Sequence, residues 1–307
     1  MKIAVIGAGG VGGAFGAALA KAGADVTFVA RGAHLAAMQA NGLKIEGGRG
    51  ETHIQPTQAT ADPATIGPVD FVLFCVKLWD VESAGEHIRP LVGPNTAVIP
   101  LQNGIDAADR LIPILGAGAV MGGVAQISAT IIAPGVIRQT GSFMRLVFGE
   151  LAGGLSPRGD AFLALCKQAG FDATHSANIL TDLWLKYILL ATNSALTAAT
   201  RNPFGKLRDD PDIFPLFEAG FAEVAAVGRA KGIALPADVV EKMVAGTKGM
   251  PADMMASMAH DLIRGGRIEL PWLTGKVVAM GKELGVPTPV HAVLNAVLKP
   301  FTMGSAG

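Results

Sequence analysis

Hydrophobic and polar positions alternate differently in the two halves of the chain, and the first half is typical of an α/β protein. Up to about residue 170, short apolar runs are separated by longer stretches of helical composition. Such runs predict strands of a parallel sheet, because these strands are covered on both faces. The predicted strands are Ile3–Ile6, Val26–Val29, Phe71–Val76 and Ala97–Ile99.

The stretches between these strands predict the helices of a doubly wound fold. Val11–Ala22 is closed by Gly23, and Gly32–Ala40 is closed by Asn41-Gly42, as helices commonly are. Since connections between parallel strands are right-handed, strands and helices in this order predict a Rossmann-type sheet. Three later runs are expected to extend this sheet, namely Met121–Ser128, Val136–Gln139 and Leu146–Gly149.

After about Asp172 the strand signals vanish and helical stretches follow one another, separated by glycine and proline. We therefore predict a Rossmann-type domain over residues 1–172 and an all-α domain over residues 173–307. The predicted helices are Asn178–Thr200, Asp212–Lys231, Ala237–Met243, Ala252–Leu262, Pro271–Leu284 and Pro289–Leu298.

Composition removes several classes of function. Lys and Arg number 25, as do Asp and Glu, so the chain has no net charge to attract nucleic acid or an anionic membrane. The apolar stretch 117–137 contains Pro134-Gly135 and predicts two strands joined by a turn, not a membrane-spanning helix. The histidines lack metal-ligand spacing, so we expect no metal. Cys75 and Cys166 form no CxxC pair and are expected to be buried thiols, which suits a cytoplasmic location.

A glycine-rich turn at the start of the chain predicts a dinucleotide site. The motif G-x-G-x-x-G alone is a weak signal, but here it follows a predicted strand and opens a predicted helix. The first glycine permits the tight turn, and the second lets the backbone approach a pyrophosphate on the helix N-terminus. The predicted cofactor-binding residues are Gly7, Gly9, Gly10, Val11 and Gly12.

The end of the second strand favours NADP(H) over NAD(H). NAD-binding folds place an acidic residue there to hold the ribose hydroxyls, whereas this chain has Arg31. An arginine can pair with the ribose 2′-phosphate that an acid would repel. The alternative is a solvated surface arginine without a ligand.

Lys186 is the most informative residue of the second half, because no other charge occurs between Asp182 and Arg201. Burial would lower its pKa and make it a proton donor near neutral pH; the alternative is a lysine that extends to solvent. Three further groups of polar residues lie where ligands bind or where a helix begins. They are Lys77 and Gln102-Asn103-Gly104 at two strand ends, and Glu269 just before Pro271.

Taken together, these residues make the chain resemble the ketopantoate reductase (2-dehydropantoate 2-reductase) family over nearly its whole length. The resemblance rests on landmarks that occur in the family's order and spacing. They are the glycine turn with Arg31, Phe-Cys-Val-Lys77, Gln-Asn103-Gly, Leu-Trp-x-Lys186, Ser257-Met258-x-x-Asp261 and Glu269-x-x-x-x-Thr-Gly275.

The resemblance implies an NADPH-dependent oxidoreductase that reduces a 2-oxo acid to a 2-hydroxy acid, as in the pantoate step of pantothenate biosynthesis. It implies that Lys186 is the general acid and that Glu269 orients it. It also implies that Lys77 and Asn103 line the nicotinamide and substrate site, and that Ser257 holds the substrate carboxylate. A negative charge developing on the carbonyl oxygen is stabilised by a cation that can give up a proton.

The chain departs from the family in its substrate positions. Where family members acting on ketopantoate carry Asn four and eight residues after the lysine, this chain has Leu190 and Ser194. Asn193 lies close to the lysine's face of the helix but about 10 Å further along its axis, so Asn193 and Ser194 are the candidate substrate contacts. Met254 also stands where the family often has a polar residue.

These departures leave three classes of function open. The first class is a reductase of the ketopantoate type, which includes a relative that reduces a different 2-oxo acid or ketone. Another hydroxyacid or opine-like dehydrogenase is the second class, although many of those use a histidine paired with a carboxylate. The third class is a non-catalytic NADP-binding regulatory protein. The apolar helical domain also makes a homodimer a candidate assembly.

Overall fold

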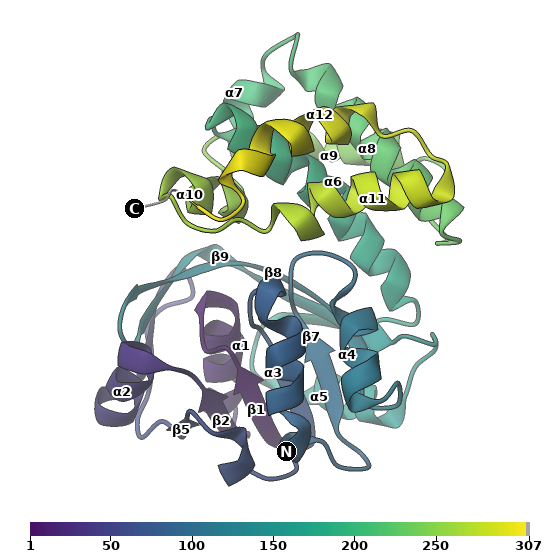
Figure 1. Ribbon diagram of the computed structural model, residues 1–307. Helices are drawn as coiled ribbons and strands as arrows, with labels where there is room; N and C mark the ends of the chain where they lie inside the picture. Colours follow the sequence, from purple (N-terminus) through teal and green to yellow (C-terminus); the bar gives the residue numbers. More distant parts are fainter. Residues whose placement is uncertain (305–307) are drawn as a thin grey trace. The chain divides into compact units, whose positions relative to one another are not determined.

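The computed structural model describes residues 1–304, and the chain folds into two compact units (Figure 1). The first unit comprises Met1–Gln102 and Asp106–Asp182, and the second comprises Asn103–Ile105 and the chain from Leu183 onward. This division lies later than the expected boundary after residue 172, which falls inside a strand of the first unit. The second unit also takes up the short segment Asn103–Ile105, which nothing in the linear order predicts.

The first unit is built on a parallel sheet of the expected Rossmann type. Its strands follow the order β5-β2-β1-β6-β7, so β1 lies between β2 and β6, and Ile3 is paired with both Val26 and Phe71. Each strand runs parallel to its neighbours, which confirms the doubly wound fold. The bounds are β1 (Lys2–Ile6), β2 (Asp25–Val29), β5 (Ala59–Thr60), β6 (Phe71–Phe74) and β7 (Ala97–Pro100).

Helices connect these strands and supply the other half of the core. Helix α1 packs between the parallel sheet and a second sheet, and it buries Phe15 and Leu19 completely. The ring of Phe15 meets that of Phe171 edge-on, with 5.2 Å between centroids. Helices α3 and α4 pack against each other (Figure 1). The bounds are α1 (Gly10–Lys21), α2 (Gly32–Asn41), α3 (Val81–His87), α4 (Ala107–Leu115) and α5 (Pro157–Gln168).

A second sheet corrects the expectation that the later strands extend the parallel one. The expected runs form the hairpin of β8 and β9, which pair antiparallel through the turn at Pro134-Gly135. A direct turn forces antiparallel pairing, whereas a parallel strand needs a long crossover. The sheet follows the order β10-β9-β3-β4 with β8 against β9. The bounds are β3 (Leu43–Gly47), β4 (Thr52–Ile54), β8 (Met121–Ala133), β9 (Val136–Glu150) and β10 (Asp172–His175).

Strand β10 also corrects the expectation that strands vanish after Asp172. It pairs in parallel with β9, for example Thr174 with Val147. Of its residues, Asp-Ala-Thr-His, only His175 is buried, and a run so short and polar gives no apolar signal.

The second unit is helical, as predicted. Its core surrounds Tyr187, Phe217 and Phe221, each less than 2 % exposed, and α8 packs against both α11 and α12. The bounds are α6 (Ile179–Thr200), α7 (Phe204–Arg208), α8 (Phe214–Ala230), α9 (Val239–Thr247), α10 (Ser257–Ile263), α11 (Thr274–Leu284) and α12 (Pro289–Leu298). Helix α6 begins in the first unit and continues into the second.

Helix α10 begins later than the predicted Ala252. The segment before it is held in an irregular conformation, because the carbonyls of Ala252 and Met254 accept hydrogen bonds from the backbone of Gly205 and Phe204. These two bonds hold Ala252 and Met254 against the start of α7, and the residues between them and α10 are not helical. Across residues 1–304, none of the helices is both long and apolar enough to cross a membrane.

Candidate active site

The glycine turn has the geometry that a dinucleotide site needs. Gly7 has φ +87°, and its amide donates to Val29 O at 3.1 Å. A Cβ added at Gly12 would lie 2.3 Å from Gly7 O, so a side chain there would break the turn. A Cβ at Gly9 would meet no described atom within 4 Å, so the backbone at Gly9 is open to a ligand. Each glycine of the motif therefore meets a different steric demand.

The N-terminus of α1 adds the electrostatic part of this site. Gly9 is the N-cap of this 12-residue helix, and Gly13 is the first amide shown to bond back, to Gly9 O at 2.7 Å. The amides of Gly10, Val11 and Gly12 therefore lie in the first turn, where the positive end of the helix dipole favours a phosphate. Open backbone at Gly9 and first-turn amides together fit the pyrophosphate of a dinucleotide.

His34 braces this turn, and the sequence analysis did not identify it. Gly135 N donates to His34 Nδ1 at 3.0 Å, so the ring proton lies on Nε2, which is 2.9 Å from Ala8 O. The imidazole thus links the glycine turn to the turn between β8 and β9. No sequence signal pointed to it, because its partners are backbone atoms.

The predicted cofactor residue at the end of β2 forms an ion pair. Arg31 follows β2, and its side chain is 88 % exposed, with Nη2 3.6 Å from Oδ2 of Asp80. Asp80 ends the 3₁₀ turn Leu78–Asp80 after β6, three residues beyond Lys77. The sequence analysis did not identify Asp80, although its position just after a strand end was a usable signal.

Lys77 and Gln102 occupy neighbouring strand ends in the first unit. Lys77 is exposed, and its Nζ lies 5.5 Å from the ring centroid of Trp79. Gln102 Nε2 donates to Phe74 O at 2.9 Å and to Val76 O at 3.0 Å. These bonds tie the chain after β7 to the end of β6.

The lysine of α6 lies in a polar cluster within the second unit. Lys186 Nζ donates to Asn103 Oδ1 at 3.0 Å. Burial lowers the pKa of Lys186 to about 8, and the negative charge of Glu269 opposes that shift. Asn103 and Glu269 are thus both close to Lys186, and the ammonium titrates within reach of neutral pH.

The backbone around Glu269 is fixed to the helix that carries Lys186. Glu269 is 5 % exposed, and its carbonyl accepts from the amides of Trp272 and Leu273 at 3.1 and 3.2 Å. The hydroxyl of Tyr187, the residue after Lys186, donates to Leu273 O at 2.7 Å. This bond holds the segment that follows Glu269 against α6.

Further along α6, the predicted substrate contacts are buried. Asn193 is 5 % exposed and Ser194 is fully buried. Within residues 1–304, Asn193 Oδ1 accepts no hydrogen bond and Ser194 Oγ has no hydrogen-bond partner. The Oγ1 of Thr274, at the start of α11, is likewise buried and unpaired within this range. Ser257 is exposed at the first position of α10, and Leu190 packs partly against the core. Thr274 belongs to the landmark Glu269-x-x-x-x-Thr-Gly275, for which the sequence predicts no role at the threonine.

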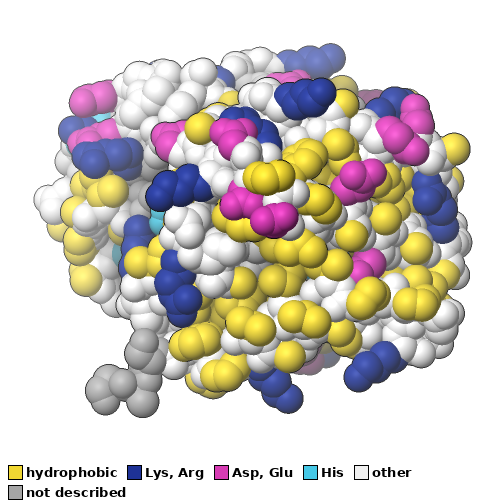
Figure 2. All heavy atoms as spheres, turned by 90° about the horizontal axis from the view of Figure 1, so that it is seen from above, with side chains coloured by type: hydrophobic (Ala, Val, Ile, Leu, Met, Phe, Trp, Pro, Cys, Tyr) yellow, Lys and Arg dark blue, Asp and Glu magenta, His cyan; other side chains and the backbone are white. Residues whose placement is uncertain are grey.

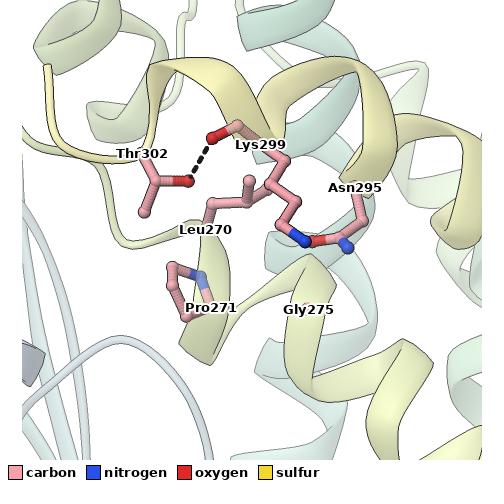
Figure 3. A pocket seen from close by; sticks show the side chains of 6 residues that line it. All are labelled: Leu270, Pro271, Gly275, Asn295, Lys299 and Thr302. Atoms are coloured by element: carbon pink, nitrogen blue, oxygen red, sulfur yellow. Dashed lines mark hydrogen bonds between the residues drawn. The ribbon is translucent and has the colours of Figure 1, made fainter.

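A separate hollow of about 410 Å³ lies near the end of the chain (Figure 3). The hydroxyl of Thr302 donates to Lys299 O at 2.8 Å at its edge. None of the predicted catalytic residues lines this hollow. The candidate active site is therefore the cluster at Lys186, where a buried lysine has a lowered pKa and a hydrogen-bond partner. The hollow is lined by Leu270, Pro271, Gly275, Asn295, Lys299 and Thr302. Within the described residues, His, Cys, Asp and Glu form no group of three that could hold a metal.

Family comparisons match both parts of the chain. Residues 3–153 match the family described as ketopantoate reductase PanE/ApbA, and residues 178–302 match its C-terminal family. A 2-dehydropantoate 2-reductase of Mesorhizobium japonicum is 31% identical over 320 residues, which cover 97% of each chain.

Solved structures resemble the chain over nearly its full length. The ketopantoate reductase of the PanE/ApbA family from Ralstonia eutropha is 34% identical, with a TM-score of 0.89 and 98% of each chain covered. The 2-dehydropantoate 2-reductase of Geobacter metallireducens is 28% identical, with a TM-score of 0.91, covering 98% of this chain and 99% of the other.

Proposed function

The chain belongs to the ketopantoate reductase family, and on that premise we propose that it reduces a 2-oxo acid to a 2-hydroxy acid with NADPH. The first candidate substrate is 2-dehydropantoate, which relatives are named for reducing. The observation that carries this proposal is the 3.0 Å bond between Lys186 and Asn103, together with the lowered pKa of that lysine.

Lys186 is the proton donor of this reaction. When bound, the reduced nicotinamide supplies a hydride to the carbonyl carbon. The carbonyl oxygen then gains negative charge and takes a proton from the Lys186 ammonium, which becomes a neutral amine and is reprotonated from water. A pKa of about 8 leaves the lysine mostly protonated at neutral pH yet acidic enough to release its proton.

Neighbouring residues hold this lysine and the substrate. Asn103 accepts a hydrogen bond from the ammonium and so fixes its direction. Glu269 keeps the lysine charged before transfer, because its carboxylate opposes the effect of burial on the pKa of Lys186. The proposed substrate contacts are Lys77, Asn103, Asn193, Ser194 and Ser257, with Lys77 and Asn103 also facing the nicotinamide.

For the cofactor, we propose that the glycine turn receives the pyrophosphate and that Arg31 receives a 2′-phosphate. The open backbone at Gly9 and the first-turn amides of α1 support the first assignment. The exposed guanidinium of Arg31 at the end of β2 supports the second. A cytoplasmic location stays a prediction, in keeping with the two free cysteine thiols.

A second candidate is reduction of a different 2-oxo acid by the same chemistry. Leu190 lies one turn beyond Lys186 on the same face of α6 and packs partly against the core. An apolar side chain there favours a substrate with an apolar group beside the carbonyl, and Met254 adds to this character. A non-catalytic, regulatory role is disfavoured by a buried lysine, which has a desolvation cost that binding alone does not require.

The deciding experiment follows NADPH oxidation across a panel of 2-oxo acids that includes 2-dehydropantoate. Turnover of 2-dehydropantoate well above the others supports the first candidate, and turnover of an apolar 2-oxo acid alone supports the second. Lys186→Ala should lower kcat by about 10²–10⁴-fold. Lys206→Ala removes an exposed lysine on α7 and should leave kcat unchanged. Unaltered turnover in Lys186→Ala would overturn the assigned acid.

We further propose that the chain is a homodimer. Val293 and Val297 lie one turn apart on α12 and are 63% and 53% exposed, and Leu216 on the adjoining helix α8 is 39% exposed. Figure 2 shows apolar side chains gathered over a broad area of one face of the molecule, with acidic side chains scattered among them. A broad exposed apolar face favours an interface, and a twofold pair of copies is the commonest way to cover one.

A further inference from the structure

An ion pair crosses the edge of the parallel sheet where the glycine turn begins. Strand β1 lies between β2 and β6 and runs parallel to both, so the three strands end at one edge. Neighbouring strands lie about 4.8 Å apart, so the ends of β2 and β6 are roughly 10 Å apart. Arg31 follows β2 and Asp80 lies in the turn after β6, and their side chains approach to 3.6 Å. The pair therefore spans the end of β1, where Gly7 begins the turn.

The contacts of Gly7 show that the glycine turn lies close to the ends of both β2 and β6, the strands that precede Arg31 and Asp80. Its amide donates to Val29 O at the end of β2, and a Cβ added to it would lie 2.9 Å from Cys75 O just after β6. A dinucleotide with its pyrophosphate on this turn extends its adenosine ribose toward the end of β2. The ribose 2′ position therefore falls beside Arg31 and, through the pair, beside the carboxylate of Asp80.

The two charges have opposite effects on a 2′-phosphate. The Arg31 guanidinium attracts it, whereas the Asp80 carboxylate repels it and competes for the same guanidinium. Toward an unphosphorylated ribose, the carboxylate can accept a hydrogen bond from the 2′-hydroxyl, as acidic residues do in NAD-binding folds. Asp80 is 33% exposed and Arg31 88%, so the pair is weak and opens readily for a ligand.

We propose that Asp80 determines the choice between the two nicotinamide dinucleotides, by holding the preference for NADP(H) low enough that NAD(H) binds as well. The inference rests on the proposed function, because it assumes that the glycine turn holds the dinucleotide. Coulomb repulsion between a phosphate with about two charges and a carboxylate roughly 6 Å away weakens binding of the phosphate about tenfold at low salt. Screening reduces this factor to about threefold at physiological ionic strength.

The test measures binding of two fragments to the full chain by calorimetry, so it needs no turnover. Adenosine 2′,5′-bisphosphate carries the 2′-phosphate, and AMP lacks it. Asp80→Asn should tighten bisphosphate binding about tenfold at low salt and about threefold at 0.15 M salt, and should leave AMP binding equal or weaker. Arg31→Ala should weaken only the bisphosphate.

A matched control removes a carboxylate elsewhere in the same unit. Asp109 is exposed in the first turn of α4, and Asp109→Asn changes the net charge as Asp80→Asn does. Equal tightening by both variants, or bisphosphate binding that is unchanged or weaker in Asp80→Asn, would overturn the proposal. So would a wild-type chain that binds neither fragment, which would also overturn the dinucleotide assignment. Normal fragment binding with an active Lys186→Ala variant would instead overturn only the assigned acid.

Discussion

Lys186 Nζ lies 3.0 Å from the side-chain oxygen of Asn103, although the two residues are 83 positions apart in the chain. The bond exists because Asn103–Ile105 leaves the first unit after β7 and folds with the helices of the second. A lysine that donates to a neutral amide, and whose pKa is raised by the charge of Glu269, is held in a fixed direction and stays protonated until it reacts. That arrangement suits a group that must release its proton during each turnover.

The first prediction concerns pH. Because the proposed acid must be protonated, kcat for ketone reduction should fall as pH rises through the pKa of Lys186, about 8. Glu269 raises that pKa, so Glu269→Gln should move the fall to lower pH, whereas loss of a purely structural residue would lower kcat without moving the profile. The measurement is kcat between pH 6 and about 10 at saturating NADPH. A profile that stays flat across this range would contradict the assignment of Lys186.

The glycine turn and the helical second half could be predicted because each depends on local signals, namely a strand followed by G-x-G-x-x-G and apolar helical stretches closed by glycine. The β8–β9 hairpin was placed in the wrong sheet, since strand composition gives no information about which sheet a strand joins. The Arg31–Asp80 pair was missed because it forms only when two strand ends meet at one edge. Lys186 stands out as a candidate because a lone charge in an apolar helix is visible in the sequence; its burial agrees with that expectation, and its catalytic role stays a prediction.

The second prediction separates function from stability at the same lysine. Burial lowers the pKa of Lys186 below that of an unfolded lysine, so the folded state holds the charged form unfavourably below about pH 8. Between that pKa and the unfolded value, the unfolded chain binds more protons, so stability rises with pH. Lys186→Met should therefore raise the free energy of unfolding by about 1–3 kcal/mol at pH 7 while lowering kcat by about 10²–10⁴-fold. Urea denaturation measures it, and a less stable variant would show that the lysine is a structural partner.

The third prediction tests the dimer. Val293→Glu would place a charge in the exposed apolar face of α12, so the chain should change from dimer to monomer in light scattering after size-exclusion chromatography. Leu155→Glu is the matched control, because Leu155 is 62% exposed but belongs to the first unit. A wild-type chain that elutes as a monomer, or a Val293→Glu dimer, would reject this face as the interface.

The last prediction concerns a buried carboxylate that holds the second unit together. Glu223 of α8 accepts hydrogen bonds from the first-turn amides of α12, Val290 N at 2.7 Å and His291 N at 3.0 Å, and a third contact joins it to His291 Nδ1 at 2.7 Å. It thus caps a neighbouring helix where its own residues supply no side-chain cap.

Removing this carboxylate leaves those amides unpaired in the interior. Glu223→Ala should cost about 2–4 kcal/mol in the free energy of unfolding by urea, whereas Glu218→Ala, exposed on the same helix, should change it by less than about 0.5 kcal/mol. Burial opposes ionisation, but the bonds from His291 and Val290 prevail and lower the pKa of Glu223. Its contribution is therefore full above the unfolded pKa and is lost as pH falls through the folded one, so the two variants should converge in stability in acid. If the gap between them stayed constant with pH, the cap would act by packing rather than by its charge.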